Sequence, residues 1–139
     1  MSKSPKQLQI SNLPTAYIID DEHYVVEFVK SIMEASGFKV IGYAYDGKQA
    51  INNLQQLKPD LILLDISMPG QEGHETLQQI KAINQNFKVI VLSSRNTIEI
   101  IKQCKEYGAS GYVLKTGGFD AVKDKINKFW NITQKNKQA

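Results

Sequence analysis

Five short apolar runs alternate along the chain with segments of helical periodicity. The runs cover residues 16–19, 38–44, 61–64, 89–92 and 111–114. Most are continuous in apolar residues, which is the pattern of strands buried on both faces of a parallel sheet. Strands that alternate with helices through right-handed crossovers form layered α/β folds. The pattern therefore predicts a doubly wound (βα)5 three-layer sandwich with a five-stranded parallel sheet.

The segments between the runs place apolar residues three and four positions apart, as amphipathic helices do. The predicted core positions of these helices are Val25, Phe28, Val29, Ile32, Ala50, Leu54, Leu57, Leu77, Ile80, Ile100, Ile101, Cys104, Phe119, Val122, Ile126 and Phe129. Asp46 stands where a helix N-cap is expected, and residues 68–70 form a predicted loop. Residues 14–132 are predicted to be one domain between polar tails at 1–13 and 133–139.

Length, composition and charge exclude several classes of function. A chain of 139 residues, 42% hydrophobic and 22% charged, is typical of one globular domain. The net charge of +3 comes largely from lysines near the ends, and Arg95 is the only arginine, so direct nucleic-acid binding is not expected. The single cysteine, Cys104, excludes an internal disulfide and a structural zinc site. No apolar leader or membrane-length run is present, which predicts a cytoplasmic protein without membrane contact.

Polar residues follow four of the apolar runs at their carboxyl ends. Asp20 and Asp21 follow the first run, Asp65 the third, Ser93 the fourth and Lys115 the fifth. Ligands of open α/β sheets bind in the crevice outside the carboxyl ends of the strands. The sequence therefore brings three carboxylates, a hydroxyl and an ammonium group to one edge, a set suited to a divalent cation and a phosphoryl group.

The clustered acids favour a metal site. Acids in the first turn of a helix are stabilised by the helix dipole, which suffices to explain Glu22 but not the acids at strand ends. Three neighbouring carboxylates repel one another unless a cation compensates. Mg²⁺, which prefers carboxylate, carbonyl and water oxygens, fits such a site, and Mn²⁺ can replace it. His23 is a further potential ligand, although a role on the helix surface is favoured.

Asp65 is the predicted nucleophile, because a carboxylate can attack phosphorus and form an acyl phosphate. Lys115 and Ser93 would bind the phosphoryl oxygens. Taken singly, Ser93 is explained as a helix cap and Lys115 as an ordinary lysine at a strand end. Their joint placement beside Asp65 favours the chemical role.

Four motifs give the chain a resemblance to the response regulator receiver domain, the phosphoacceptor of two-component signalling. The matching segments are Ile18–Glu22, Asp60–Gly70 with Gly73, Val91–Ser93 and Gly108–Lys115, and the resemblance extends over residues 15–132. It implies a flavodoxin-like fold. It also implies that Asp65 is phosphorylated by a histidine kinase, a phosphotransfer protein or a small phosphodonor.

The resemblance also assigns roles to the residues around Asp65. It implies that Mg²⁺ is bound directly by Asp21, Asp65 and the Ser67 carbonyl, and through water by Asp20. The resemblance further implies that Ser93 and Lys115 bind the phosphoryl group. It implies that Ser93 and Tyr112 form the switch, with Tyr112 turning inward when the Ser93 hydroxyl moves toward the phosphate. Ser67 and Arg95 occupy the positions that tune the lifetime of the acyl phosphate in this family, and Arg95 either pairs with phosphoryl oxygens or lies in solvent. Ser94 is expected to add a hydroxyl near the phosphate.

The resemblance implies a signalling switch that assists its own phosphorylation and dephosphorylation and is not a turnover enzyme. Output would pass through a protein partner or an output domain absent from this chain, and dimerisation on phosphorylation is compatible with it. The alternative is a phosphatase of the haloacid dehalogenase type, which needs a second acid where Ser67 stands. A flavodoxin-like cofactor binder is disfavoured because no Gly-rich phosphate loop follows the first run.

Overall fold

A five-stranded parallel sheet forms the centre of the computed structural model, which describes residues 12–67, 73–95 and 98–138. The strands are β1 (Thr15–Ile19), β2 (Lys39–Ala44), β3 (Leu61–Asp65), β4 (Val89–Ser93) and β5 (Gly111–Leu114), in the spatial order β2-β1-β3-β4-β5. The predicted fold class is confirmed, and each predicted strand end lies within one residue of the observed one. The predicted loop at 68–70 and most of the N-terminal tail lie outside the described residues.

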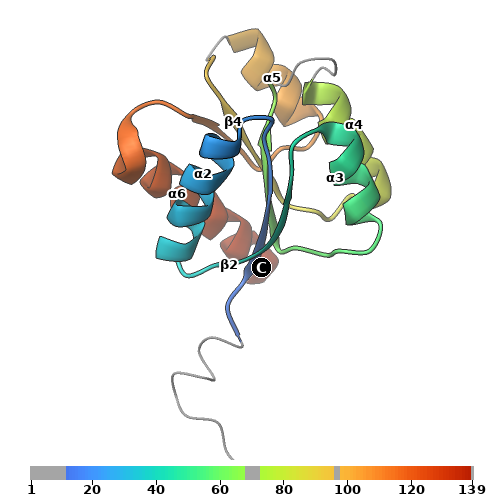
Figure 1. Ribbon diagram of the computed structural model, residues 1–139. Helices are drawn as coiled ribbons and strands as arrows, with labels where there is room; N and C mark the ends of the chain where they lie inside the picture. Colours follow the sequence, from blue (N-terminus) through green and yellow to red (C-terminus); the bar gives the residue numbers. More distant parts are fainter. Residues whose placement is uncertain (1–11, 68–72, 96–97, 139) are drawn as a thin grey trace, which may run out of the picture.

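Five helices cover the two faces of the sheet. They are α2 (His23–Ala35), α3 (Gly47–Leu54), α4 (Gly73–Ile83), α5 (Ile98–Glu106) and α6 (Gly118–Gln138). In Figure 1, α2 and α6 lie together on one side of the sheet, and α3, α4 and α5 lie on the other. The predicted cap is present, since Asp46 accepts a hydrogen bond of 2.7 Å from the backbone N–H of Gln49. Across the described residues, none of the helices combines the length and apolarity that a membrane crossing requires.

Two apolar cores separate the sheet from the helix layers. The core under α2 and α6 includes Ile18, Val29, Ile32, Leu63, Ile90, Val113, Val122 and Ile126. The core under α3, α4 and α5 includes Tyr17, Ile19, Leu54, Ile62, Leu64, Leu77, Ile80 and Cys104. Alternate residues of each central strand enter opposite cores, because successive side chains of a strand point to opposite faces. The continuous apolar runs are thereby explained.

Two details of the helix faces differ from the predictions. The buried face of α2 consists of Val26, Val29, Ile32 and Met33, whereas Val25 and Phe28 are only half-buried. The sequence of α2 offers two overlapping apolar stripes, and packing against the sheet selects the one centred on Val29. In α5 only Cys104 is buried, and Ile101 is 36% exposed.

The last helix is longer than its apolar pattern indicates. The predicted polar tail at 133–139 was placed too early, because α6 continues through Gln138. Thr133 is buried and donates a hydrogen bond of 2.7 Å to the Trp130 carbonyl. The ring of Trp130 packs edge-on against Phe38, which precedes β2, with centroids 5.0 Å apart. This contact fixes the later turns of α6 near the amino end of β2.

Gly111 lets α6 pack closely against β5. A methyl group added to Gly111 would lie 2.6 Å from Cδ2 and 2.8 Å from Cβ of Phe129. Both atoms belong to the α6 side chain that covers the start of this strand. A side chain larger than hydrogen at position 111 must therefore displace α6 or β5.

We expect Gly111→Ala to destabilise the fold by about 1–3 kcal/mol, the usual cost of overpacking a filled core. Urea denaturation followed by circular dichroism measures the change. The control is the same substitution in a Phe129→Ala background, where the ring atoms are gone and the added cost should be smaller. An equal cost in both backgrounds would contradict the assigned contact.

Candidate functional site

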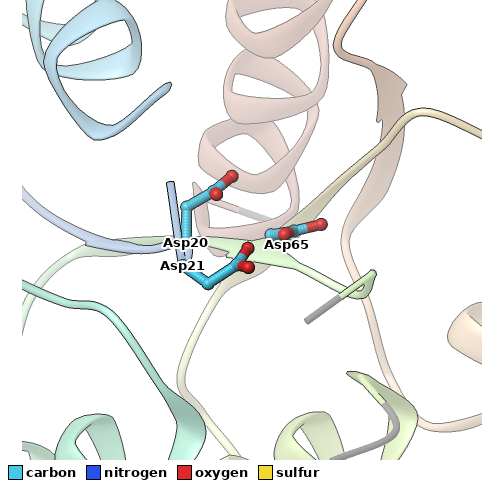
Figure 2. A group of neighbouring side chains, drawn as sticks. All are labelled: Asp20, Asp21 and Asp65. Carbon is cyan, nitrogen blue, oxygen red and sulfur yellow. The ribbon is translucent and has the colours of Figure 1, made fainter. Parts of the chain in front are cut away.

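Three carboxylates gather at the carboxyl ends of β1 and β3. Asp20 and Asp21 follow β1, and Asp65 is the last residue of β3. One carboxylate oxygen from each of them lies within 4.8 Å of the others (Figure 2). Asp20 and Asp65 are 2% and 1% exposed, while Asp21 is half-buried. The three predicted acids therefore form one cluster that opens to solvent on the side of Asp21.

The backbone holds the two buried carboxylates in place. Oδ1 of Asp20 accepts a hydrogen bond of 3.0 Å from the N–H of Glu22, and Oδ1 of Asp65 accepts one of 2.8 Å from the N–H of Ser67. The sheet ladder also continues past the strand ends, since the N–H of Asp20 donates to the Ala44 carbonyl at 3.1 Å. The positions of these carboxylates are therefore set by main-chain geometry.

Lys115 reaches the acid cluster from the end of β5. Its N–H donates to the Ser93 carbonyl at 2.8 Å, which extends the β4–β5 pairing by one residue. Its Nζ lies 2.8 Å from Oδ2 of Asp20 and 3.2 Å from Oδ1 of Asp65. One ammonium group thus contacts two buried carboxylates. The structure brings Lys115 to Asp65, and it also shows a contact with Asp20 that the sequence did not indicate.

Burial dominates the titration of this cluster. Burial raises the pKa of Asp65, and the Ser67 amide and Lys115 oppose it only in part. Burial likewise raises the pKa of Asp20 against the opposing effects of Lys115 and the Glu22 amide. For Lys115, burial acts to lower the pKa, but its contacts with Asp20 and Asp65 outweigh burial and raise the pKa. The ammonium form is therefore retained at neutral pH.

The charges of the cluster do not balance. Three carboxylates face one ammonium group, which leaves an excess of two negative charges when all are ionised. Because these oxygens all lie within 4.8 Å of one another, two ionised carboxylates of the cluster repel by at least roughly 3.5 kcal/mol at an effective dielectric constant of about 20. A divalent cation has the charge that compensates this excess.

The oxygen donors suit magnesium. Oδ2 of Asp20 is buried and paired with Nζ of Lys115 at 2.8 Å, and the second lone pair of this oxygen can accept a hydrogen bond from a metal-bound water. Among the described residues, the only cluster with metal-ligand spacing consists of these three acids. His23 lies outside it and stacks its ring on Tyr45 with centroids 3.8 Å apart, in agreement with the favoured surface role.

Ser93 and Tyr112 both contact Arg95. Ser93 ends β4 and is fully buried, and its Oγ accepts a hydrogen bond of 3.0 Å from the N–H of Arg95. Tyr112, in β5, is half-buried and donates its hydroxyl hydrogen to the Arg95 carbonyl. Burial raises the pKa of the Tyr112 hydroxyl, which keeps it protonated as a donor. The segment after β4 is thus attached to both predicted switch residues.

A cavity of about 690 Å³ opens over the acid cluster. Asp21, Asp65, Ser67, Ser94 and Lys115 contribute polar groups to its lining. Arg95, which was predicted to act here, is exposed and does not line this cavity.

Two features of the cavity were not predicted from the sequence. Tyr24 lines it and is 72% exposed. The helical pattern of α2 gave no signal for this, because an exposed tyrosine in a first turn is unremarkable by itself. Val25 and Phe28 were predicted as core residues, and the helical pattern gave no signal that these half-buried side chains also line the cavity.

Comparisons with known proteins agree on one family. The sequence profile of the response regulator receiver domain matches residues 16–127. Sporulation initiation phosphotransferase F of Bacillus subtilis is 30% identical over 112 residues, which make up 81% of this chain and 90% of that protein. Chemotaxis protein CheY of the same organism is 31% identical over 114 residues, 82% of this chain and 95% of that protein.

A solved structure of the same kind superposes well on this chain. The crystal structure of the CheX-CheY-BeF3-Mg+2 complex from Borrelia burgdorferi aligns with a TM-score of 0.79 at 26% sequence identity. The alignment covers 84% of this chain and 89% of that chain. The match therefore extends over most of both chains.

We expect Asp65→Asn to stabilise the fold by about 0.5–2 kcal/mol in metal-free buffer at pH 7. The pKa of Asp65 is higher in the folded than in the unfolded protein, so ionisation of this carboxyl lowers the free energy of unfolding at every pH above the folded-state pKa. The neutral amide of asparagine does not have this destabilising effect. Lys115 keeps Asp20 as its partner in the variant. Thermal unfolding with a chelator present measures the effect.

The matched control for this prediction is Asp124→Asn, which removes an exposed acid on α6. We expect its stability to stay within about 0.5 kcal/mol of the wild type. A loss of stability in Asp65→Asn would show that the ionised carboxylate stabilises the fold, contrary to the burial argument.

Proposed function

Because the chain belongs to the family of response regulator receiver domains, we propose that it is the phosphorylation-dependent switch of a two-component system, with Asp65 as phosphoacceptor. The observation that carries this proposal is the pair of contacts from Lys115 to Asp20 and Asp65 at the mouth of an open cavity. An ammonium group placed there can bind the oxygens of a phosphoryl group that reaches Asp65.

In the proposed reaction, a carboxylate oxygen of Asp65 attacks the phosphorus of the donor. The bond from phosphorus to the donor's nitrogen or oxygen breaks, and its electron pair leaves with the donor. Lys115 binds a phosphoryl oxygen as charge develops, and the Ser93 hydroxyl donates to another. Asp65 is held for attack by the Ser67 N–H, which occupies Oδ1 and leaves Oδ2 as the reacting atom.

The metal is magnesium in this proposal. Asp21, Asp65 and the Ser67 carbonyl would bind it directly, and Asp20 would bind one of its waters. When bound, Mg²⁺ neutralises negative charge shared by the carboxylates and the phosphoryl oxygens. The uncompensated negative charge of the three clustered carboxylates supports this assignment.

The switch would pass through Arg95. When the Ser93 hydroxyl turns to a phosphoryl oxygen, its hydrogen bond with the Arg95 N–H is strained or lost. Tyr112 holds the carbonyl of the same residue, so a shift of this segment moves the tyrosine with it. The exposed Ile98 and Ile101 of α5 follow directly in the chain, and we assign this face to the downstream partner.

Partners and lifetime complete the proposal. A histidine kinase or phosphotransfer protein supplies the phosphoryl group, and output passes to a protein partner, to an output domain outside this chain or to a dimer of phosphorylated copies. Ser67 is exposed and lines the cavity, where its side chain can govern the approach of water to the acyl phosphate. Arg95 is exposed and bonded through its backbone N–H to Ser93, and we assign it the same role. The cytoplasmic location stays a prediction.

Acetyl phosphate with Mg²⁺ should add one phosphoryl group per chain, and Asp65→Asn should abolish the addition. Intact-protein mass spectrometry measures the stoichiometry, and beryllofluoride gives a stable analogue of the same adduct. Asp124→Asn is the matched control and should label like the wild type. Unchanged labelling of Asp65→Asn would overturn the proposal, and sustained release of phosphate from simple phosphomonoesters would favour the phosphatase alternative.

Magnesium binding is testable without phosphorylation. Titration calorimetry should show uptake of one Mg²⁺ per chain at millimolar concentrations. Asp21→Asn should weaken the affinity on the order of tenfold, because affinity for hard cations follows the charge of the ligand set. Asp124→Asn again serves as control. Equal affinity of Asp21→Asn and the wild type would remove Asp21 from the ligand set.

A further inference from the structure

The cavity above Asp65 has two chemically different parts. Its polar part contains Asp21, Asp65, Ser67 and Lys115, which the proposed function uses. Glu22, Tyr24 and Ser94 add further polar groups to the lining. The rest is an apolar wall, formed by Val25, Phe28, Val29, Leu92 and Val122. Nothing in the proposed phosphoryl transfer requires this wall.

Two of the five side chains of the apolar wall, Val25 and Phe28, are not fully covered by the core. Val29, Leu92 and Val122 are buried at its base, whereas Val25 and Phe28 are half-buried on its flank. The Phe28 ring is held edge-on against Phe119 of α6, with centroids 6.1 Å apart and planes at 82°. The wall is therefore a fixed surface supported by both helices of its layer.

The polar part determines what can occupy the cavity. A ligand that places a phosphoryl group between Lys115 and the acid cluster must place the group attached to phosphorus elsewhere in the same cavity. A volume of about 690 Å³ lies in the range of small-molecule sites and exceeds what a phosphoryl group alone fills. The attached group that the wall suits is short and aliphatic.

We propose that the apolar wall binds the acyl chain of small acyl phosphates, so that donors with propionyl or butyryl chains phosphorylate Asp65 at lower concentrations than acetyl phosphate does. This inference rests on the proposed function. In the reaction, a bond forms between an Asp65 oxygen and phosphorus, and the bond from phosphorus to the acyl oxygen breaks. The acyl group leaves as a carboxylate with that electron pair, without a change of oxidation state.

The size of the effect follows from apolar burial. Each fully buried methylene is worth roughly fourfold in affinity. The apolar wall contacts the acyl chain from one side only, so we expect the affinity to rise about twofold for each added methylene. The half-saturating concentration of butyryl phosphate should thus be about fourfold lower than that of acetyl phosphate.

The experiment measures labelling rates of the full chain with acetyl, propionyl and butyryl phosphate in the presence of Mg²⁺. Each rate is divided by the spontaneous hydrolysis rate of its donor, which removes differences in intrinsic reactivity. Phosphoramidate, which lacks an acyl chain, is the reference donor. The chain length should change the half-saturating concentration and leave the maximal rate nearly constant.

Two variants locate the effect. Val25→Thr replaces a methyl group of the wall by a hydroxyl and should flatten the dependence on chain length. Val40→Thr is the matched control, because Val40 is also half-buried against the core under α2 and α6 but does not line the cavity. Val25→Ala gives the same readout if the hydroxyl disturbs α2.

The outcomes separate this inference from the proposed function. Equal half-saturating concentrations for all three acyl phosphates would overturn the inference and leave the phosphoacceptor role intact. If the dependence on acyl-chain length persists in Val25→Thr and Val25→Ala, the acyl chain does not bind to the apolar wall. Absence of labelling with every donor, phosphoramidate included, would overturn the proposed function itself.

Discussion

The pairing of one ammonium group with two buried carboxylates determines the character of this protein's functional edge. Asp20 and Asp65 lie beneath Lys115 with almost no exposure to water, and Asp21 adds a third negative charge at the surface. A buried charge left without a partner costs several kcal/mol, so Lys115 stabilises the fold in addition to the chemical role proposed for it. One lysine still compensates only part of the charge, and the remaining excess makes the edge receptive to a divalent cation.

The sheet produces this arrangement through its register. Asp65 pairs with Leu92, and Ser93 pairs with Leu114, so neighbouring strands end within about a residue of one another. Hydrogen bonds from the N–H groups of Asp20 and Lys115 extend the ladder beyond the strands. The side chains of the acid cluster and Lys115 are thus attached to the hydrogen-bonded ladder of the sheet. Arg95 is held by the side chains of Ser93 and Tyr112 instead, which is compatible with the proposed movement of this residue.

Much of this could be predicted from the sequence, because buried parallel strands and their polar ends leave a strong local pattern. The order of elements, the Asp46 cap and the cluster of Asp20, Asp21 and Asp65 all follow from that pattern. The buried face of α2 did not, since two apolar stripes overlap and only tertiary packing chooses between them. The end of α6 was missed because its last turns are polar.

Contacts between long side chains could not be predicted from the sequence for a different reason. The ion pair of Lys115 with Asp20 depends on four rotatable bonds, which spacing along the chain does not constrain. The apolar wall of the cavity arises because Val25 and Phe28 are turned partly out of the core, a rotation that the helical period leaves open.

The position of Trp130 has a practical consequence. Its indole packs against Phe38, just before the start of β2, whereas the acids follow the carboxyl ends of β1 and β3. The only tryptophan of the chain is therefore remote from the acid cluster, and its surroundings depend on the docking of α6. We therefore expect tryptophan fluorescence to report on the docking of α6 and to change little when Mg²⁺ or phosphoryl donors are added.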